Sequence, residues 1–350
     1  MSSQSIRLGI IGAGWPGRKH AEGAKQSGGY RVAAVADLIP DRRKAIAAKF
    51  GGAKEFEDAD ALLKSADIEA VTIAVPNHLH AAIAIAALKA GKHVLIEKPP
   101  ANTTKDARKV SAAAVKAGKI VLYGLQRRFG PAEQAAKLAI GKGYAGGIYH
   151  VRAAWLRTRG VPVGTGWFTQ KKNSGGGAMM DLGISMLDLA WFLLDQPKPV
   201  GAFAVTHRKL AGAGTSGAPS AGGFDVEDAA FAMLTFEGGA TLELSASWAL
   251  NQPPQQQGTL CRLFGEGGCV DVYTPAGAVI YRQFDAKGQS KPTQLKPPRL
   301  GGHAGLMRHF RECILGKAIP AVGAREGIVL MEMIEAIYKS AATGKSVAIG

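Results

Sequence analysis

Short apolar segments rich in β-branched residues alternate with alanine-rich segments through the first 125 residues. The apolar segments are RLGII, RVAAVAD, AVTIAVP, KHVLIEK and KIVLYG, with helical sequences such as DRRKAIAAKF and HAAIAIAALKA between them. Short runs without polar alternation are typical of strands that are buried on both faces. This alternation of strands and helices predicts a parallel sheet that is covered by helices on both sides.

A glycine-rich turn follows the first apolar segment. Gly12, Gly14 and Gly17 form the pattern GxGxxG just before a helical segment. Such glycines permit a tight turn and let a pyrophosphate approach the amino end of the helix. Asp37 ends the second predicted strand, about 20 residues after the last glycine, where a carboxylate binds ribose hydroxyls. The pattern predicts a Rossmann dinucleotide-binding unit; the alternative for Asp37 is that it only caps the next helix.

The character of the chain changes after about residue 145. Longer apolar stretches separated by turn residues predict a mostly antiparallel sheet, with helices near 175–194, 303–316 and 324–343. A chain of 350 residues is long enough for two domains. We therefore predict an α/β Rossmann domain with a doubly wound parallel sheet at residues 1–125. An α+β domain with a large, mostly antiparallel open sheet is expected at residues 126–350.

Positive charge is spread evenly along the sequence. The net charge is +16, and residues 1–125 and 126–350 each contribute +8. Nucleic-acid binders usually gather basic residues on one face or in one tail. We therefore expect no nucleic-acid partner, and instead a field that attracts anionic cofactors.

The cysteines and the amino terminus bear on the cellular compartment. Three cysteines without CxxC spacing argue against a disulfide framework and against a zinc site. We see no basic start followed by an apolar signal run, and no apolar run of the roughly 18 residues that a membrane span needs. The sequence therefore predicts a cytoplasmic protein without a membrane partner.

Two charged residues end the predicted strand at 92–98. Glu97 and Lys98 precede two prolines, at the sheet edge where open α/β proteins bind ligands. The pair is therefore either a surface end or a functional site. His78 and His80 follow the preceding strand, but no carboxylate or cysteine stands at ligand spacing from them. We predict no metal site there.

A second polar group lies inside an apolar helical stretch. Asp181, Ser185 and Asp188 recur at i, i+4 and i+7, which places them on one helical face. Carboxylates are rarely buried unless a partner satisfies them. This helix therefore needs a polar partner from elsewhere in the fold.

These motifs together resemble those of the glucose–fructose oxidoreductase / inositol dehydrogenase (Gfo/Idh/MocA) family. The resemblance rests on GAGWPG, AVAD, AVPNHLHAAIAIAALKAGKHVLIEKP, GLQRRF, GWF, SGGGAMMDLG and HFRECILGK, and extends from Ile6 to about Val347. It implies NAD(P)-dependent transfer of a hydride between nicotinamide and a carbohydrate carbon of a sugar, polyol or glycoside. It also implies an oligomer that is built on the sheet of the second domain.

The resemblance further implies the residues of the site. Lys98 would meet Asp181 beside the nicotinamide, where the lysine stabilises negative charge on the substrate oxygen. Arg128, Trp167 and Ser185 would lie near the substrate; the alternative for Trp167 is an aromatic side chain that only packs in its loop. The residues implied to bind the cofactor are Gly12, Ala13, Gly14, Trp15, Asp37, Pro76, Asn77, His80, Glu97, Lys98 and Gln126. We expect the cofactor to be NAD because Asp37 would repel a 2′-phosphate; Arg42 and Arg43 leave NADP open.

The sequence departs from the family pattern at one position. The family usually places its proton-accepting histidine four residues after the aspartate, and this chain has Ser185 there. A serine hydroxyl is no base near neutral pH. Lys98 is then the expected proton acceptor, with His150 and His303 as alternatives, and Asp188 is expected to be structural.

Three functions stay open on these residues. The first is a sugar or polyol dehydrogenase or reductase. The second is an enzyme that cleaves a glycosidic bond by transient oxidation with bound NAD, and the third is a non-catalytic sensor of the cofactor. Apolar residues on both faces of strands at 226–250 and 259–273 predict a homodimer or homotetramer.

Overall fold

The structure is a computed structural model that describes residues 5–64, 67–162, 166–210, 223–275, 277–297 and 301–350. Its residues form two compact units. The first comprises Met1–Phe129 and Leu300–Met331, and the second comprises Gly130–Arg299 and Glu332–Gly350. Each unit is described by itself below.

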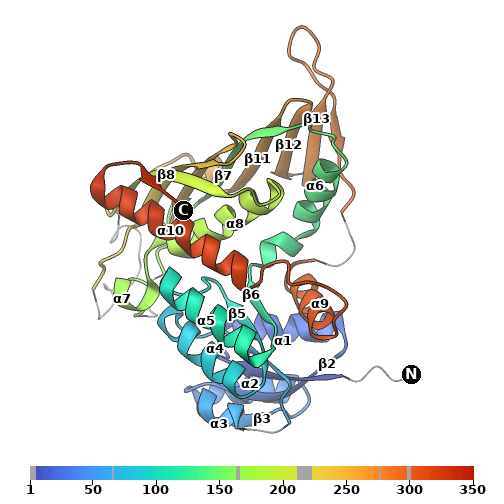
Figure 1. Ribbon diagram of the computed structural model, residues 1–350, viewed down its shortest axis with the longest axis vertical. Helices are drawn as coiled ribbons and strands as arrows, with labels where there is room; N and C mark the ends of the chain where they lie inside the picture. Colours follow the sequence, from blue (N-terminus) through green and yellow to red (C-terminus); the bar gives the residue numbers. More distant parts are fainter. Residues whose placement is uncertain (1–4, 65–66, 163–165, 211–222, 276, 298–300) are drawn as a thin grey trace. The chain divides into compact units, whose positions relative to one another are not determined.

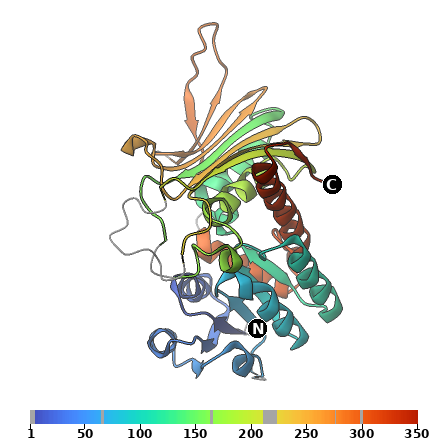
Figure 2. The same cartoon turned by 90° about the vertical axis from the view of Figure 1, so that its left-hand side faces the viewer.

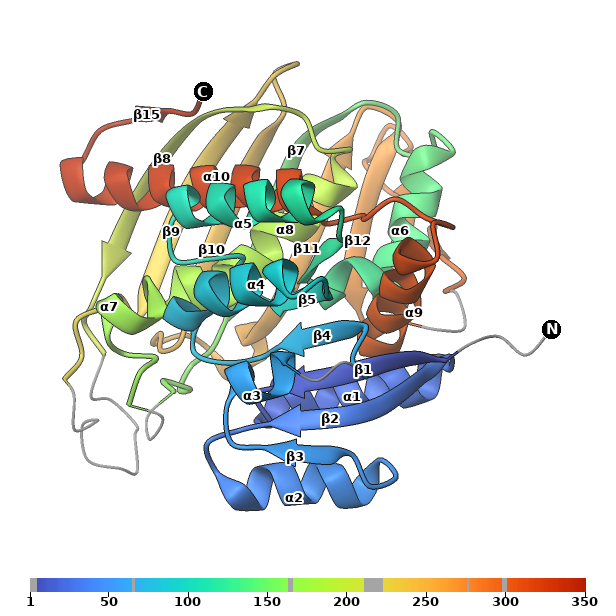
Figure 3. The same ribbon diagram turned by 60° about the horizontal axis from the view of Figure 1, so that its bottom comes forward.

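Six parallel strands form the sheet of the first unit, in the order β3-β2-β1-β4-β5-β6. Their bounds are β1 Ile6–Ile11, β2 Tyr30–Ala36, β3 Lys54–Phe56, β4 Ala70–Ile73, β5 His93–Glu97 and β6 Val121–Gly124. Figure 3 shows β1 to β4 side by side and pointing the same way. The order reverses between β1 and β4, and ligands of open parallel sheets bind outside the carboxyl ends at such a reversal. The predicted doubly wound sheet is confirmed.

Helices connect these strands and cover the sheet. They are α1 Trp15–Ser27, α2 Pro40–Lys49, α3 Ala59–Leu63, α4 His80–Lys89, α5 Thr104–Ala117 and α9 Gly302–Ile314, with short helical turns η1 Asn77–Leu79 and η2 Gln126–Phe129. Helix α5 shows how local sequence sets its ends. The Thr103 hydroxyl accepts from the Asp106 amide at the start, and Gly118 takes the left-handed conformation at the end.

Helix α9 belongs to the first unit, although the predicted domain boundary placed it in the second. Its Leu306, Met307 and Phe310 join the buried cluster that contains the β1 side chains. It also packs against α1, where a Cβ on Gly23 would lie 2.7 Å from the His303 carbonyl oxygen. A single boundary in the sequence cannot separate the two units, because the chain leaves the first unit and later returns to it.

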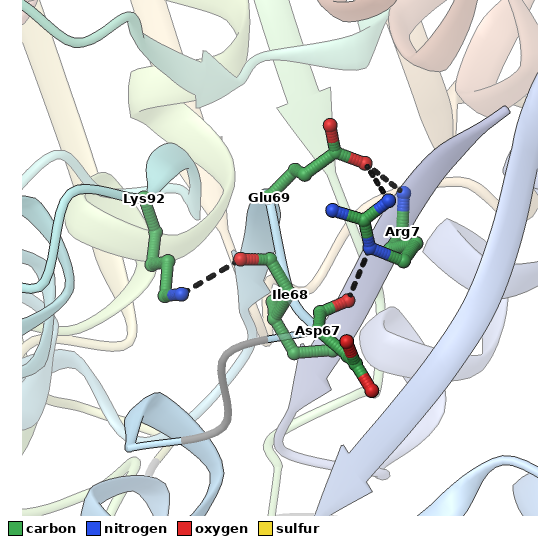
Figure 4. A network of polar contacts seen from close by, with 5 residues as sticks. All are labelled: Arg7, Asp67, Ile68, Glu69 and Lys92. Carbon is green, nitrogen blue, oxygen red and sulfur yellow. Dashed lines mark hydrogen bonds and ion pairs between the residues drawn. The ribbon is translucent and has the colours of Figure 1, made fainter. Parts of the chain in front are cut away.

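The amino ends of the strands are joined by a polar network (Figure 4). The Arg7 amide donates to Glu69 Oε2 over 3.0 Å, and Arg7 Nε donates to the Asp67 carbonyl over 2.8 Å. Lys92 Nζ donates to the Ile68 carbonyl over 2.7 Å, and burial lowers the pKa of this ammonium. The chain's own polar groups therefore occupy this edge of the sheet, opposite the carboxyl ends.

Nine strands form the sheet of the second unit, in the order β14-β13-β12-β11-β7-β10-β9-β8-β15. Figure 1 labels β8, β7, β11, β12 and β13 of this sheet. Their bounds are β7 Ile148–Leu156, β8 Pro199–His207, β9 Ala229–Phe236, β10 Thr241–Ser247, β11 Gly258–Gly265, β12 Gly268–Thr274, β13 Gly277–Arg282, β14 Pro292–Gln294 and β15 Val347–Ala348. The pair β7–β10 is parallel, and the other pairs of the described strands are antiparallel. The predicted large, mostly antiparallel sheet is confirmed.

Helices pack on one face of this sheet. The elements in contact with it are α6 Pro131–Gly141, the π-helical turn η3 Met179–Gly183 and α8 Ile184–Leu193, while α7 Lys171–Ser174 and the exposed short turn η4 Pro254–Gln256 lie in connecting segments. Helix α10, Ala324–Thr343, begins in the first unit and ends in the second. Helix α8 contacts β7 and β10, and Figure 2 shows it against the sheet. The strand residues that it covers, such as Val151 and Leu244, are fully buried.

One apolar segment is longer than the sequence analysis expected. Lys171–Leu193 has 23 residues, and the mean hydropathy of its most apolar 18-residue stretch is 1.2, enough by length and composition to cross a membrane. Yet 89% of its most apolar stretch is buried inside the protein. This is typical of a core helix, and the segment carries η3 and α8, which lie against the sheet.

Candidate active site

The glycine-rich turn after β1 requires its first and last glycines for steric reasons within the chain. Gly12 has a φ of +91°, and a Cβ there would lie 2.2 Å from the Ala74 carbonyl oxygen. A Cβ on Gly17 would lie 1.8 Å from the Gly12 carbonyl oxygen. These contacts bring α1 close against the end of β1.

Gly14 differs from these two glycines. The nearest atom to a Cβ on Gly14 would be Pro16 Cδ, at 3.8 Å, so the chain itself leaves space there. Gly14 caps α1, whose first turn carries no acidic residue and whose amino end favours anions. Trp15 is 58% exposed beside this space. The turn therefore fits the pyrophosphate of a dinucleotide.

Asp37 lies at the end of β2 and closes the glycine turn. Its Oδ2 accepts from the Ala13 amide over 2.7 Å, and its Oδ1 accepts from the Ile39 amide over 2.8 Å. Each oxygen keeps a further lone pair for a ribose hydroxyl. Arg43 donates to the Asp37 carbonyl over 2.9 Å and lies 3.6 Å from Glu55, whereas Arg42 is exposed. Arg43 is thus already engaged with its neighbours.

Glu97 is held in place by a buried cluster at the end of β5. Its Oε1 lies 2.9 Å from His20 Nε2, and its Oε2 accepts from the Lys98 amide over 3.1 Å. Burial by itself raises the pKa of Glu97, but the His20 hydrogen bond and the neighbouring cationic groups outweigh it, so this pKa lies below its ordinary value. The carboxylate therefore stays charged and fixes the backbone at Lys98.

His303 of α9 completes this cluster. The ligand-type atoms of His20, Glu97 and His303 all lie within 4.8 Å of one another, and burial lowers the pKa of His303 to about 4. Two imidazoles and a carboxylate could ligate zinc by type. The 2.9 Å between His20 and Glu97 is, however, a hydrogen-bond distance, and we interpret the cluster as a polar network that positions Glu97.

His80 links the turns that follow β4 and β5. Its Nδ1 lies 2.8 Å from the Pro99 carbonyl oxygen, and its Nε2 lies 2.9 Å from the Val75 carbonyl oxygen. The ring is fully buried, and burial lowers its pKa. His80 thus supports the turn that presents Lys98, while His78 is exposed. The other residues predicted at this edge follow their strands: Pro76 and the buried Asn77 after β4, half-buried Lys98 after β5, and half-buried Gln126 after β6.

Arg128 has a different environment from the one expected of a substrate residue. It is 1% exposed, and its NH1 donates to the Ala321 carbonyl over 2.7 Å. This bond ties η2 to the segment between α9 and α10 within the first unit. We therefore leave Arg128 out of the proposed substrate site.

Asp181 lies in the second unit, in the π-helical turn η3 rather than in the regular helix that we expected. Its Oδ2 accepts from the indole Nε1 of the fully buried Trp248 over 2.9 Å. A Cβ on Gly183 would lie 2.3 Å from Met179 Sδ, so this turn packs tightly on itself. Such π-turns occur often at functional sites.

An aromatic series connects Trp167 to Asp181. Trp167 stacks on Phe168 with ring centroids 4.0 Å apart, and Phe168 meets Trp248 edge-on at 6.5 Å. Sequence reasoning missed Trp248. The one available signal was its type, because a buried indole N–H usually has a hydrogen-bond partner.

Helix α8 carries the other two polar residues of this stretch. Ser185 is 5% exposed, one turn after Asp181, and Asp188 is fully buried. His150 alternates along β7 with Val151 and Ala153, which are buried under the helices, so it faces the opposite side of the sheet. There it bonds Thr241 Oγ1 over 2.8 Å. His150 is therefore a poor candidate for the base.

Lys98 lies in the first unit, whereas Asp181, Ser185 and Trp167 lie in the second. The pairing of Lys98 with Asp181 stays a prediction. The structure does bring residues together within each unit. In the first, the glycine turn, Asp37 and the Glu97–Lys98 turn share the carboxyl edge of the parallel sheet.

Comparison with known proteins identifies the family to which this architecture belongs. Residues 6–125 match the oxidoreductase family with an NAD-binding Rossmann fold, and residues 134–271 match the GFO/IDH/MocA C-terminal domain. The chain is 32% identical over 355 residues to D-glucoside 3-dehydrogenase of Escherichia coli (strain K12), covering 99% of this chain and 98% of the relative. It is 29% identical over 351 residues to 1,5-anhydro-D-fructose reductase of Ensifer adhaerens, covering 98% of each.

A solved structure agrees with these matches. GenD2 from gentamicin A biosynthesis, in complex with NAD, superimposes with a TM-score of 0.81 at 26% identity, covering 99% of this chain and 97% of that one. The sequence resemblance is thereby confirmed along the whole chain. This protein belongs to the GFO/IDH/MocA family of oxidoreductases, and its first unit contains the family's NAD-binding Rossmann domain.

Proposed function

We propose that this protein is an NAD-dependent oxidoreductase that interconverts a hydroxyl and a carbonyl group on a sugar, polyol or glycoside. The observation that carries the proposal is the turn after β5. There the buried Glu97 holds the backbone of Lys98 at the sheet edge that also bears the glycine turn. A relative named D-glucoside 3-dehydrogenase, matched over 99% of this chain, supports a carbohydrate substrate.

Each residue of the proposed site has one task. Bound NAD supplies the hydride acceptor or donor. In reduction the Lys98 ammonium donates a proton to the substrate oxygen and stabilises its developing negative charge, and in oxidation neutral Lys98 accepts that proton. Asp181 orients Lys98, Ser185 bonds the same substrate oxygen, and Trp167 lies against the substrate. Gly12, Ala13, Gly14, Trp15, Asp37, Pro76, Asn77 and Gln126 hold the cofactor, while His80 and Glu97 support its site.

Ser185 also favours a second candidate, a non-catalytic sensor of NAD, because the usual histidine is missing. A glycoside-cleaving enzyme with transient oxidation is a third. Net formation of NADH with a sugar or polyol supports the proposed dehydrogenase. Glycoside cleavage without net NADH supports the third candidate, and NAD binding without any turnover supports the sensor.

We propose that the protein works in a reducing compartment, the cytoplasm. Among the described residues, Cys261, Cys269 and Cys313 take part in no disulfide. Burial raises the pKa of Cys313 to about 11, which keeps this thiol protonated and unreactive. The even charge distribution of the sequence supports a small anionic ligand over a nucleic-acid partner.

The first prediction concerns the choice of cofactor. Asp37→Ser removes the charge that repels a 2′-phosphate and weakens the hold on the ribose, so the preference for NAD over NADP should fall by about tenfold. Titrations of both nucleotides, followed by fluorescence, measure this ratio. Asp41→Ser changes an exposed carboxylate one turn away and should leave it unchanged. Tighter binding of NADP than of NAD by the unmodified protein would contradict the assignment.

The second prediction concerns Lys98. Lys98→Met keeps the length of the side chain but removes its charge and its donors. Turnover should fall by about two to four orders of magnitude, as expected for a group that stabilises the transition state. The affinity for NAD should change little. Lys105→Met, on the nearby helix α5, is the matched control, and retained activity in Lys98→Met would move the chemistry elsewhere.

The third prediction concerns the proton acceptor. With serine at 185 the substrate proton passes to neutral Lys98, and an ordinary lysine loses its proton near pH 10.4. Oxidation needs this unprotonated form, so its rate should rise into the alkaline range without an inflection between pH 6 and 7. His303 does not add one, because its pKa of about 4 leaves it neutral at those values.

A pH–rate profile of three proteins tests this route. Ser185→His should create an inflection near pH 6.5 and speed oxidation at neutral pH. Ser185→Ala should cost less activity than Lys98→Met. The lysine route fails if the unmodified enzyme already shows an inflection between pH 6 and 7 that His303→Ala abolishes.

We also propose that the protein is a homodimer or homotetramer that is assembled across the outer face of the large sheet. Phe203 and Met233 are paired in register on β8 and β9, and they are 47% and 41% exposed. Val205 is 41% exposed and pairs with Phe231 in the same ladder. Neighbouring exposed apolar side chains of this kind mark a surface for another chain.

The fourth prediction tests this assembly by sedimentation velocity. The unmodified protein should be a dimer or tetramer at micromolar concentration, and Phe203→Asp should shift it to a smaller species because a charge would be buried in the interface. Val115→Asp replaces an 81% exposed residue of α5 and should leave the size unchanged. A monomeric unmodified protein would refute the proposal.

A further inference from the structure

We propose that Glu227 and Tyr338 are positioning residues that set the place of Asp181. We call them the Glu227–Tyr338 clamp. The inference rests on the proposed function, since it gives these residues a role in turnover only if Asp181 has one. Neither side chain is bonded to the Asp181 carboxylate; both act through the glycine-rich turn that precedes η3.

Glu227 accepts hydrogen bonds from three consecutive backbone amides of this turn. Glu227 Oε2 accepts from the Gly177 amide and Oε1 from the Met179 amide, each over 2.9 Å. The Glu227 carbonyl oxygen accepts from the Ala178 amide over 3.1 Å. The first amides of a helix have no partner inside the helix. Glu227, which lies just before β9, thus caps the helical segment of Asp181 from a distant part of the sequence.

Tyr338 of α10 completes the clamp. Its hydroxyl donates to Glu227 Oε1 over 2.8 Å. Burial raises the pKa of Tyr338 well above its ordinary value, so the hydroxyl stays protonated and remains a donor. Burial also raises the pKa of Glu227, against the effect of its hydrogen bonds to amides and to Tyr338. The two side chains form one enclosed polar unit.

The glycines of the turn are required by the clamp. A Cβ on Gly176 would lie 2.0 Å from the Tyr338 hydroxyl oxygen, and a Cβ on Gly177 would lie 1.9 Å from the Glu227 carbonyl oxygen. The Asp181 amide donates in turn to the Gly177 carbonyl over 3.0 Å. The clamp is therefore linked to the backbone of Asp181 through a single residue.

The same short segment also holds the partner of Asp181. The Trp248 amide donates to the carbonyl oxygen of Asp228, the residue after Glu227, over 2.8 Å. The Trp248 indole then donates to Asp181 Oδ2. Residues 227–228 thus fix both the donor and the acceptor of the Trp248–Asp181 hydrogen bond. Movement of the clamp would move the carboxylate relative to this indole.

Two substitutions test the clamp with little change of volume. Tyr338→Phe removes the hydroxyl, and Glu227→Gln keeps the shape but removes the charge. Turnover should fall about tenfold in Tyr338→Phe and about 100-fold in Glu227→Gln, since small misplacements of reacting groups cost this much. The KM for the substrate and the Kd for NAD should stay within about twofold, because the NAD site belongs to the first unit.

A spectroscopic measurement tests the clamp without any substrate. The sequence has five tryptophans, so ¹⁵N-indole spectra are simple, and Trp248→Phe assigns the Trp248 resonance. This resonance should shift in both clamp variants toward its position in Asp181→Asn. The other indole resonances should stay in place, among them that of Trp191, which donates to the Pro197 carbonyl. Tyr149→Phe and Glu237→Gln, at exposed positions, are matched controls.

The outcomes separate the possible failures. An unshifted Trp248 resonance together with unchanged turnover in both variants overturns the clamp. A general loss of stability with normal turnover per folded molecule also overturns it, because it leaves a structural role alone. If Asp181→Asn and Lys98→Met retain activity, the proposed function fails. The position of the Trp248 resonance still decides whether the clamp sets the place of Asp181.

Discussion

Carboxylates that accept backbone amides fix three turns of the proposed site, and two of these carboxylates, Glu97 and Glu227, are removed from water. Asp37 accepts the Ala13 amide of the glycine turn, and Glu97 accepts the amide of Lys98. Glu227 accepts the amides of Gly177 and Met179. A shift of the turn at Glu97 or at Glu227 would leave a buried carboxyl group without its donors. The backbone at these turns is therefore set by electrostatics as well as by packing.

The carboxylates that accept backbone amides have different electrostatic surroundings in the two units. The hydrogen bond to His20 and the neighbouring Lys98 hold the pKa of Glu97 below its ordinary value despite burial. Glu227 receives neutral donors, two amides and a phenol, which do not offset the effect of burial, so its pKa is raised. Glu97 thus contributes a fixed negative charge at the carboxyl edge of the parallel sheet, which is expected to bind the cofactor. Glu227 contributes mainly geometry.

The local parts of the fold were predictable, and the parts built by distant residues were not. The strand–helix alternation predicted the parallel sheet, and GxGxxG predicted the dinucleotide-binding turn. Each pattern depends on residues that are close together in the sequence. His303, Trp248 and Glu227 carry no local signal, since α9, the segment after β10 and the segment before β9 reach their partners only through the tertiary fold. The π-turn at Asp181 also escaped prediction, because the spacing at 181–188 fits a regular helix equally well.

Satisfying carboxylates with amides has a consequence for proton transfer. Asp181 in the proposed site already accepts the Trp248 indole, and Glu97 is held charged and bonded to His20. The Ser185 hydroxyl has no useful basicity. Of the residues assigned to the substrate oxygen in the proposed function, Lys98 is the one proposed to exchange a proton with it. In the proposed function the groups that hold the site are therefore distinct from Lys98, the group proposed to exchange the proton.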